Sequence, residues 1–403
     1  MKSVLSIDVA NGKSKVLLIT EYGEVLIEPY EIKHCLNEFN LLKDKIDKLK
    51  LNDLTIFMES TSTYHLPIQR FFTKSSYNVQ VINPILGKNN TRNLRKTKTD
   101  IEDCYNLADL FFKNTVKIHT KNMNDIYSSM IELSRQEKHL TELLVRSKNR
   151  FKQIIANAFP EYIKCFTASD IYGKTSLNFI KEFPHADIVK EKRIDALANN
   201  LYKSSKNGCS YSKCLNKAKK IKELANNSYP GINIDSCEVS NLINIVDIIS
   251  YNDSKLNDVK QDIVKLAKQT PYFNIINSIY GIGETSTAQI IAELGDINRF
   301  ENIKQLNAFC GLDPTIVQSG KSINYHGPIS KRGNRNARKI LFITCCSIIR
   351  SSVLHNVDNE ILIYYRKKQA ENKHFKECIT ACSTKLLRII FAMCKNNSLY
   401  VQK

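Results

Sequence analysis

The amino-acid sequence predicts an α/β domain followed by a mostly helical remainder. In the first quarter of the chain, short apolar segments alternate with helical patterns, which is typical of an α/β fold. Two long stretches further on carry apolar residues at every third or fourth position, which predicts two long helices. The length of 403 residues is too great for one ordinary core and suggests two to four domains at about 150 residues each.

The N-terminal domain is predicted to contain three strands in a meander, then helix, strand, helix, strand and helix. Strands are expected over residues 3–9, 15–20, 24–29, 54–58 and 79–82, and helices over 32–49 and 66–72. Asn11-Gly12 favours a tight turn between the first two strands. The continuous apolar run at 54–58 favours a strand buried on both faces. A ribonuclease H-like domain has this order of elements, as do several other α/β folds.

Two seams of apolar residues with heptad-like spacing predict the long helices. The first seam comprises Ile126, Met130, Leu133, Leu140, Leu144, Phe151, Ile154 and Ala158, with Glu137 and Ser147 at the two intervening positions. The second comprises Leu242, Ile245, Ile249, Asn252, Leu256, Val259, Ile263 and Leu266, in which the polar Asn252 is typical of a residue that fixes register. Such helices could form a coiled coil within the chain or between subunits, or they could be ordinary amphipathic helices on a globular core.

These patterns divide the chain into three regions. We expect an α/β domain at 1–118, a central region at 119–270 and a mostly helical domain at 271–403. The central region consists of the long helices and a Lys- and Asn-rich helical insert at about 167–236. In the last region, Gly281-Ile282-Gly283 lies between two helical patterns, which is typical of a helix-hairpin-helix module and equally of a simple helix C-cap.

The composition is that of a globular protein with a strongly basic balance. With 42% hydrophobic and 25% charged residues, it excludes a collagen, a mostly disordered chain and a bundle of membrane helices. Lys and Arg total 59 against 40 Asp and Glu, a net charge of +19. Such an excess indicates a polyanionic partner, most often nucleic acid. A ribosomal protein or a membrane-surface protein could have the same excess of positive charge. The charge therefore predicts a class of partner but no type of reaction.

Neither a membrane segment nor a zinc site is expected. The N-terminal apolar stretch is interrupted by Asp8, and the run at 340–349 is far shorter than the roughly 20 residues that a bilayer requires. The twelve cysteines include no Cys-x-x-Cys pair, so we expect them to behave as small apolar residues in a reducing compartment. We therefore expect a cytoplasmic protein without contact to a membrane.

Four acidic residues of the first domain are placed as metal ligands could be. Asp8 lies in the middle of a predicted strand, Glu59 ends the apolar strand, and Asp100 and Asp103 begin a predicted helix on one face. A carboxylate on a central strand is costly unless it is solvated, paired or bound to metal. Carboxylates gathered in this way suit Mg²⁺, and two such ions can assist phosphodiester displacement. The alternatives are an N-cap at Asp100 and surface ion pairs for the others.

Two basic segments are candidates for nucleic-acid binding. Lys88, Arg92, Arg95, Lys96 and Lys98 precede the two aspartates. Lys321, Lys331, Arg332, Arg335 and Arg338 surround Ser319, with no acid between Asp313 and Asp358. Such groups could neutralise a nucleic-acid backbone and stabilise charge on a phosphoryl transition state, under which Ser319 could act as a nucleophile. Solvated basic loops and a plain Ser-Gly turn are the alternatives.

In their order along the chain, these motifs resemble the DEDD-type insertion-sequence transposases of the IS110 group, which are bridge-RNA-guided serine recombinases. The N-terminal motifs are Asp8, Glu59-Ser60-Thr61 with Tyr64, Asn83-Pro84, and Lys98-Thr99-Asp100 with Asp103. The C-terminal motifs are Gly281-Ile282-Gly283, Glu293-Leu294-Gly295-Asp296 with Arg299-Phe300, Gly311-Leu312-Asp313-Pro314, Ser319-Gly320, and the segment 329–334 with Arg338. Ser62 and Cys104 replace a glycine and an alanine that are common in the family.

The resemblance implies a RuvC-like N-terminal domain, a C-terminal transposase domain and a specific chemistry. Asp8, Glu59, Asp100 and Asp103 would hold two Mg²⁺ ions, for which Mn²⁺ could substitute, and Ser319 would attach covalently to DNA. A bridge RNA would pair with donor and target DNA. Homodimers would assemble into tetramers, with the carboxylates of one subunit and the serine of another in a composite site. The alternatives are a RuvC-like junction nuclease that uses water and a non-catalytic nucleic-acid-binding regulator.

Overall fold

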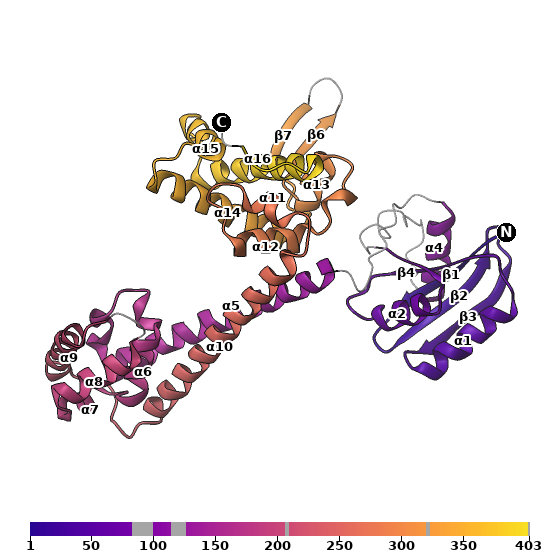
Figure 1. The fold of residues 1–403 in the computed structure, drawn as a ribbon. Helices are drawn as coiled ribbons and strands as arrows, with labels where there is room; N and C mark the ends of the chain where they lie inside the picture. The colour runs from indigo at the N-terminus through magenta and orange to yellow at the C-terminus, as the bar shows by residue number, and fades with distance from the viewer. Residues whose placement is uncertain (83–99, 114–125, 206–208, 320–322, 402–403) are drawn as a thin grey trace. The chain divides into compact units, whose positions relative to one another are not determined.

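The structure is a computed structural model of the chain that describes residues 1–82, 100–113, 126–205, 209–319 and 323–401. Two compact units are present, Met1–Asp125 and Ile126–Lys403, and each is described by itself (Figure 1). The prediction of an α/β domain followed by a mostly helical remainder is confirmed. The division into three regions stays a prediction.

The first unit contains a five-stranded sheet in the order β3-β2-β1-β4-β5. Its elements are β1 (Lys2–Val9), β2 (Lys13–Thr20), β3 (Val25–Lys33), α1 (Leu36–Lys48), β4 (Asp53–Glu59), α2 (Leu66–Lys74), β5 (Asn78–Ile82) and α4 (Asp100–Phe112). Strands β1, β2 and β3 are antiparallel, whereas β1, β4 and β5 run parallel. Strand β3 is longer than expected, because Ile32 is buried in the sheet core and α1 begins only at Leu36.

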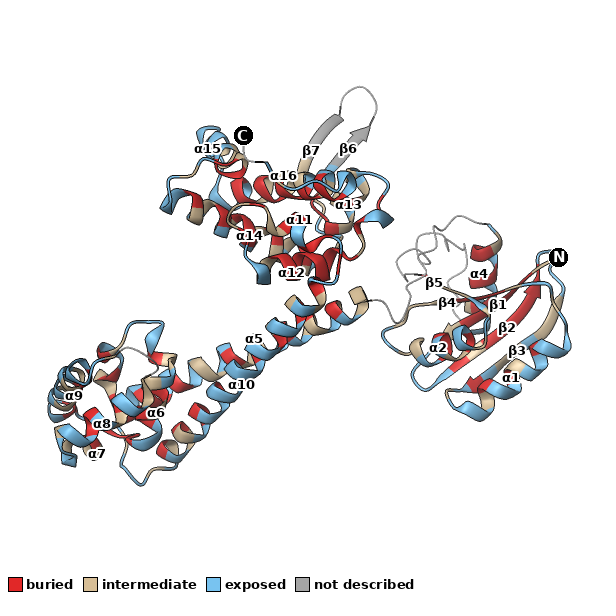
Figure 2. Cartoon of the chain, in the orientation of Figure 1, coloured by how far each residue is buried: buried red, intermediate tan, exposed pale blue. Residues whose placement is uncertain are grey.

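Helices cover both faces of this sheet. Because successive side chains of a strand point to opposite faces, Leu5 and Ile7 join the core beneath α1 and α2, while Val4 joins the core beneath α4. Figure 2 shows the buried residues following the central strands. Burial on both faces explains why the sequence of β4 is an unbroken apolar run.

The second unit begins with two long helices, α5 (Ile126–Ala158) and α10 (Cys237–Ala267), which pack along each other within the chain (Figure 1). Asn252 is buried in the second seam, only 8% exposed, as its seam position predicts. Between the two helices lie η1 (Pro160–Cys165), η2 (Asp170–Tyr172), α6 (Lys174–Glu182), α7 (Ala186–Glu191), α8 (Ile194–Ser204) and α9 (Tyr211–Asn226). These form a core of their own with parts of α5 and α10. The supercoiling of the two long helices stays a prediction.

The rest of the second unit is a helical core that carries one hairpin. Its elements are α11 (Phe273–Asn277), α12 (Glu284–Leu294), η3 (Ile297–Arg299), α13 (Ile303–Cys310), β6 (Pro314–Ser319), β7 (Ile323–Ile329), α14 (Arg335–Leu354), α15 (Glu360–Ala370) and α16 (Phe375–Asn396). Gly281 has a φ of +83°, and a Cβ there would lie 2.9 Å from the Cα of Ile348. This glycine therefore allows close packing against α14, and the helix-hairpin-helix function stays a prediction.

The cysteines behave as the composition suggests. All twelve are free thiols, and most of them are buried. Burial raises the pKa of Cys310, Cys382 and Cys394 to about 12, so these thiols stay protonated at neutral pH and pack as apolar groups. Within the described ranges, no helix has the length and apolar character that crossing a membrane requires.

Candidate active site

Asp8 and Glu59 lie at the same edge of the sheet. In the parallel register of β1 and β4, Ile7 is opposite Met58, so the next residue of each strand is Asp8 and Glu59. Alternation along the strands places both on the α4 face, because Val4 and Phe57 belong to the core under α4. Both side chains are half-buried. The sheet therefore places two carboxylates side by side at the carboxyl ends of neighbouring parallel strands.

Asp100 and Asp103 reach this edge through the first turn of α4. Helix α4 packs on β1, β2 and β4, and its fully buried Cys104 donates from Sγ to the backbone oxygen of Lys15 at 3.5 Å. Burial raises the pKa of Cys104 to about 12, and the nearby charges of Asp8 and Asp103 act in the same direction. The thiol therefore lies close to both carboxylates, and the first turn of α4 adjoins the end of β1.

Lys15 adds a positive charge that sequence reasoning missed. It is opposite Asp8 in the antiparallel register of β1 and β2, so both side chains lie on the same face of the sheet. Its Nζ is 3.7 Å from Oδ2 of Asp100, and the Lys15 side chain is only 26% exposed. The sequence did not predict the position of Lys15 beside Asp8, because the register of two strands, and not their composition, decides which residues lie opposite each other.

Whether these acids hold a metal stays a prediction. In the part of the chain that the structure describes, no three His, Cys, Asp or Glu side chains are placed together so that they could hold a metal ion. The chemical type of the candidate ligands fits a hard cation, because all four are carboxylates. Asp8, one residue before the end of β1, lies beside Glu59, the last residue of β4, and both Asp8 and Asp103 lie near Cys104. Asp100 is exposed and interacts with Lys15.

The second candidate, Ser319, is the last residue of β6 and is paired with Ile323 of β7. The hairpin stands at the edge of the helical core (Figure 1). Its base is fixed by Ser330, whose backbone nitrogen donates to the oxygen of Asp313 at 2.8 Å and whose Oγ donates to Oδ1 of Asp313 at 2.6 Å. Ser319 thus ends a strand that is anchored at its start.

Two glycines let the ends of α13 and α14 meet at this base. Gly311 has a φ of +64°, and a Cβ on Gly333 would lie 2.2 Å from the backbone oxygen of Phe309. Arg338 closes the contact, because its Nη1 donates to the oxygens of Cys310 at 2.8 Å and Gly333 at 3.0 Å. Arg338 therefore has a structural role, and its predicted contact with nucleic acid stays untested.

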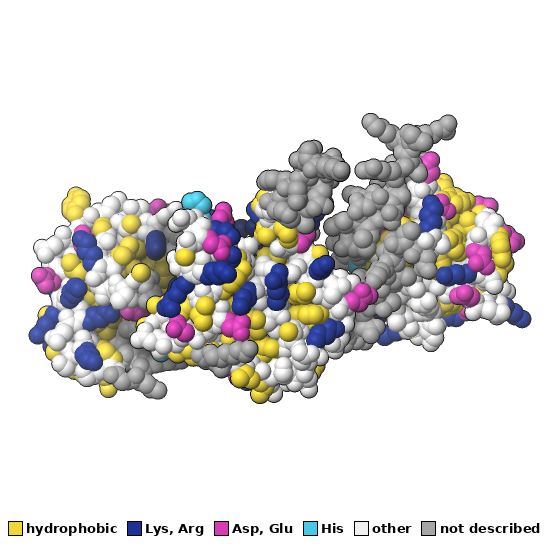
Figure 3. All heavy atoms as spheres, turned by 90° about the horizontal axis from the view of Figure 1, so that it is seen from above, with side chains coloured by type: hydrophobic (Ala, Val, Ile, Leu, Met, Phe, Trp, Pro, Cys, Tyr) yellow, Lys and Arg dark blue, Asp and Glu magenta, His cyan; other side chains and the backbone are white. Residues whose placement is uncertain are grey.

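The other predicted basic residues fall into two groups. Lys331, Arg332 and Arg335 are exposed at the start of α14. Figure 3 shows Lys and Arg side chains widely spread over one face of the described residues. Lys88, Arg92, Arg95, Lys96, Lys98 and Lys321 lie outside the residues that the structure describes.

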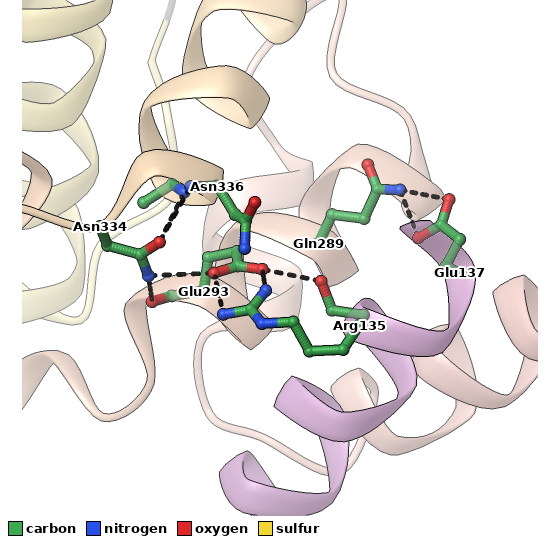
Figure 4. Close-up of polar contacts among 8 residues, drawn as sticks. Arg135, Glu137, Gln289, Glu293, Asn334 and Asn336 are labelled. Atoms are coloured by element: carbon green, nitrogen blue, oxygen red, sulfur yellow. Dashed lines mark hydrogen bonds and ion pairs between the residues drawn. The ribbon is translucent and has the colours of Figure 1, made fainter. Parts of the chain in front are cut away.

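A buried carboxylate, Glu293 of α12, joins this region to α5 (Figure 4). It is 2% exposed and accepts hydrogen bonds from Ser134 Oγ at 2.7 Å, from both terminal nitrogens of Arg135, and from Asn334 Nδ2 at 3.0 Å. Asn334 in turn caps α14, because its Oδ1 accepts from the backbone nitrogen of Asn336 at 3.0 Å. Glu293 thereby ties α5 and α12 to the turn that follows the hairpin.

A second polar pair lies beside this cluster. Gln289 Nε2 donates to the two carboxylate oxygens of Glu137 at 2.6 and 2.7 Å. Glu137 occupies a non-apolar position of the first predicted seam. Its hydrogen bonds with Gln289 explain why an acid is tolerated at this position. Sequence reasoning gave neither Glu293 nor Glu137 a partner, because their partners lie on other helices far along the chain.

Two family models match the chain. A DEDD-type IS110 model described as a transposase matches residues 5–160, and the model of the IS116/IS110/IS902 transposase family matches residues 273–357. The first range contains the four acidic candidates, and the second contains Ser319 and the Glu293–Asn334 contact. The matches also support a RuvC-like fold for the first unit.

Known relatives share part of this chain. The transposase for insertion sequence element IS1111A of Coxiella burnetii is 29% identical over 37% of this chain and 40% of its own length. A pilin gene-inverting protein of Moraxella bovis is 27% identical over 37% of this chain and 48% of its own length. An IS110 insertion-element protein of Streptomyces coelicolor is 25% identical over 35% of this chain and 33% of its own length. The matched segment thus spans less than half of each relative. On the two family matches and these relatives, the chain belongs to the IS110 family of transposases.

Proposed function

We propose that this protein cuts and rejoins the DNA of an insertion sequence through a covalent phosphoserine intermediate at Ser319, with a bridge RNA that pairs with donor and target DNA. One observation carries the proposal. A single chain contains Asp8 and Glu59 side by side on neighbouring parallel strands of a ribonuclease H-like sheet and a serine at the end of an anchored β-strand, each within a matched transposase segment. Activity, substrates and partners are inferred from this combination.

The carboxylates of Asp8, Glu59, Asp100 and Asp103 would hold the divalent cations, Mg²⁺ or Mn²⁺. When bound, two such ions polarise the scissile phosphate and stabilise the charge on the entering and leaving oxygens. The half-buried positions of Asp8 and Glu59 support this role, because a partly desolvated carboxylate gains more from a cation than an exposed one does. Lys15 would neutralise part of the acidic charge.

The covalent step exchanges one ester for another. The hydroxyl of Ser319 loses its proton and its oxygen attacks the phosphorus, while the bond to the leaving sugar oxygen breaks and that oxygen takes up a proton. The phosphoserine bond preserves the energy of the phosphodiester, so that rejoining needs no ATP. Lys331, Arg332 and Arg335, exposed after the hairpin, would neutralise the approaching phosphates.

The proposal includes an assembly. The carboxylates belong to one compact unit and Ser319 to the other. We propose that homodimers form tetramers in which carboxylates and serine of different subunits act together, in the cytoplasm and without a membrane.

The test is strand transfer by the purified protein with donor DNA, target DNA and the RNA transcribed beside its gene. Joined products are expected with Mg²⁺ and the RNA together, and none after addition of EDTA or omission of the RNA. Free nicked ends without joined products would favour the water-using nuclease. Binding without any cleavage would favour a non-catalytic regulator.

Removal of the Lys15 charge should strengthen cation binding. We expect Lys15→Gln to raise the Mg²⁺ affinity roughly fivefold, because a unit charge at about 4 Å in a solvated site contributes about 1 kcal/mol. Titration of thermal unfolding with MgCl₂ measures this affinity. The control is Lys43→Gln, which removes a lysine that is paired with Asp47 in the same unit. Equal Mg²⁺ affinities for both variants would contradict the placement of the cations beside Lys15.

A further inference from the structure

The helical insert, at about residues 167–236, lies between the two matched transposase segments. The first segment ends at residue 160 and the second begins at residue 273. Its helices have their own core, shared only with parts of α5 and α10. The insert is therefore an additional folded module whose surface is not explained by the chemistry proposed above.

Two acid-free stretches provide the charge of this module. Residues 143–160 contain no Asp or Glu and include Arg146, Lys148, Arg150 and Lys152 of α5. Residues 196–222 also contain no Asp or Glu, and their α9 portion includes Lys213, Lys217, Lys219, Lys220 and Lys222. Lys213, Lys217 and Lys220 are four and three positions apart, so they share one face of α9.

Each of the two stretches contacts an aromatic ring of the segment 165–172. Lys217 Nζ lies 3.6 Å from the ring centroid of Phe166. On the other side, Lys148 Nζ and Lys152 Nζ lie 4.9 and 5.8 Å from the ring centroid of Tyr172. Phe166 contacts the core residue Tyr162, and Tyr172 contacts Phe151 of α5. We call Lys148, Lys152, Lys213, Lys217 and Lys220 with these two rings the insert basic face.

The lysines of this face are not used in ion pairs. Within the described ranges, none of the five forms a salt bridge, whereas Lys255 of α10 pairs with Asp258 at 3.2 Å. Lys222, on α9, differs from the five because it has a structural role within the insert. Lys222 donates to the backbone oxygens of Val189 at 3.2 Å and Lys192 at 2.6 Å, and so caps the end of α7.

The chemistry of the face fits a phosphate backbone. Like charges on one face repel one another, and burial beside Phe166 lowers the pKa of Lys217, although the nearby charge of Asp170 acts in the opposite direction. A polyanion would remove both costs, with one phosphate for each lysine in the manner of counterion release. The rings fix the lysine stems, which reduces the side-chain entropy that binding must overcome.

We propose that the insert basic face binds the sugar–phosphate backbone of nucleic acid, through residues other than the four carboxylates and Ser319. The interaction is with phosphates and is independent of base sequence. The α9 lysines of this face lie outside both matched segments, whereas Lys148 and Lys152 lie near the end of the first.

The test compares two triple variants, each losing three helical lysines. Lys213→Gln, Lys217→Gln and Lys220→Gln remove the α9 part of the face. The control replaces Lys255, Lys260 and Lys265 of α10, which alternate with Asp253, Asp258 and Asp262. Binding of a fluorescein-labelled DNA duplex and of an RNA hairpin is followed by anisotropy at several salt concentrations. All proteins carry Ser319→Ala, so the result does not depend on catalysis.

For the face variant we expect the slope of log K against log salt to fall by roughly 2 to 3 for at least one probe, with a loss of affinity of about tenfold or more at 0.1 M salt. The probe that responds identifies DNA or RNA as the ligand. Slopes equal to the control for both probes would overturn the proposal. If the α9 variant is unfolded by circular dichroism, Lys148→Gln with Lys152→Gln makes the same comparison from α5, with a slope change of about 2 expected.

Discussion

Replacement of Glu293 by alanine is expected to destabilise the second unit by about 3–5 kcal/mol. The carboxylate is 2% exposed and is the common acceptor for Ser134, Arg135 and Asn334. Its removal leaves a partly buried guanidinium and two polar groups without their acceptor, and a buried ion pair that loses one partner typically costs this much. Urea unfolding followed by far-ultraviolet circular dichroism measures the change.

The matched control for this variant is Asp258→Ala on α10. Asp258 pairs with Lys255, but both side chains are about half exposed, so a change of no more than about 0.5 kcal/mol is expected. Because Asn334 caps α14 directly after the hairpin, Glu293→Ala should also weaken the anchoring of β6 and β7. Equal stability of Glu293→Ala and Asp258→Ala would show that the cluster in Figure 4 does not hold the helices together.

Asp8→Asn is expected to lower DNA cleavage at least about a thousandfold with little effect on folding. Asparagine has nearly the same shape, and Asp8 is only half-buried at the strand end. Loss of its charge removes a ligand for ions that contribute several kcal/mol to the transition state. The measurement is the single-turnover rate of cleavage at saturating Mg²⁺.

The control for Asp8 is a carboxylate at the opposite edge of the same strand pair. Asp53 begins β4, is opposite Lys2 of β1 and is exposed. Asp53→Asn should therefore cleave at the wild-type rate. A rate for Asp8→Asn within tenfold of that control would remove Asp8 from the site.

The sequence was informative wherever local pattern decides structure. The alternation in β1, the apolar run of β4 and the seam through Asn252 are local patterns, so β1, β4 and the long helices were predicted close to their observed ends. The prediction that a helix begins at residue 32 was wrong, because Ile32 is paired with Ser14 in the sheet. An apolar residue such as Ile32, at the boundary between a strand and a helix, fits both the strand pattern and the helix pattern. Its pairing with the neighbouring strand β2 determines that it belongs to the strand.

Contacts between distant segments could not be predicted. Lys15 meets Asp100 through strand register and helix packing, and Glu293 meets Arg135 across 158 positions of the chain. For Arg338, charge suggested a phosphate ligand, whereas its Nη1 binds two backbone oxygens. An arginine has five donors, so composition alone cannot distinguish a nucleic-acid contact from a structural one.

The proposed activity depends most directly on the covalent bond to Ser319. Wild-type protein is incubated with DNA, the RNA and Mg²⁺, denatured, and digested with nuclease and trypsin, and the peptides are sequenced by mass spectrometry. We expect a nucleotide attached to Ser319 in wild-type protein and no adduct in Ser319→Ala, with Ser347→Ala, at an exposed serine of α14, as the control that retains the adduct. Joined DNA products without any adduct at Ser319, or full strand transfer by Ser319→Ala, would contradict the proposed mechanism.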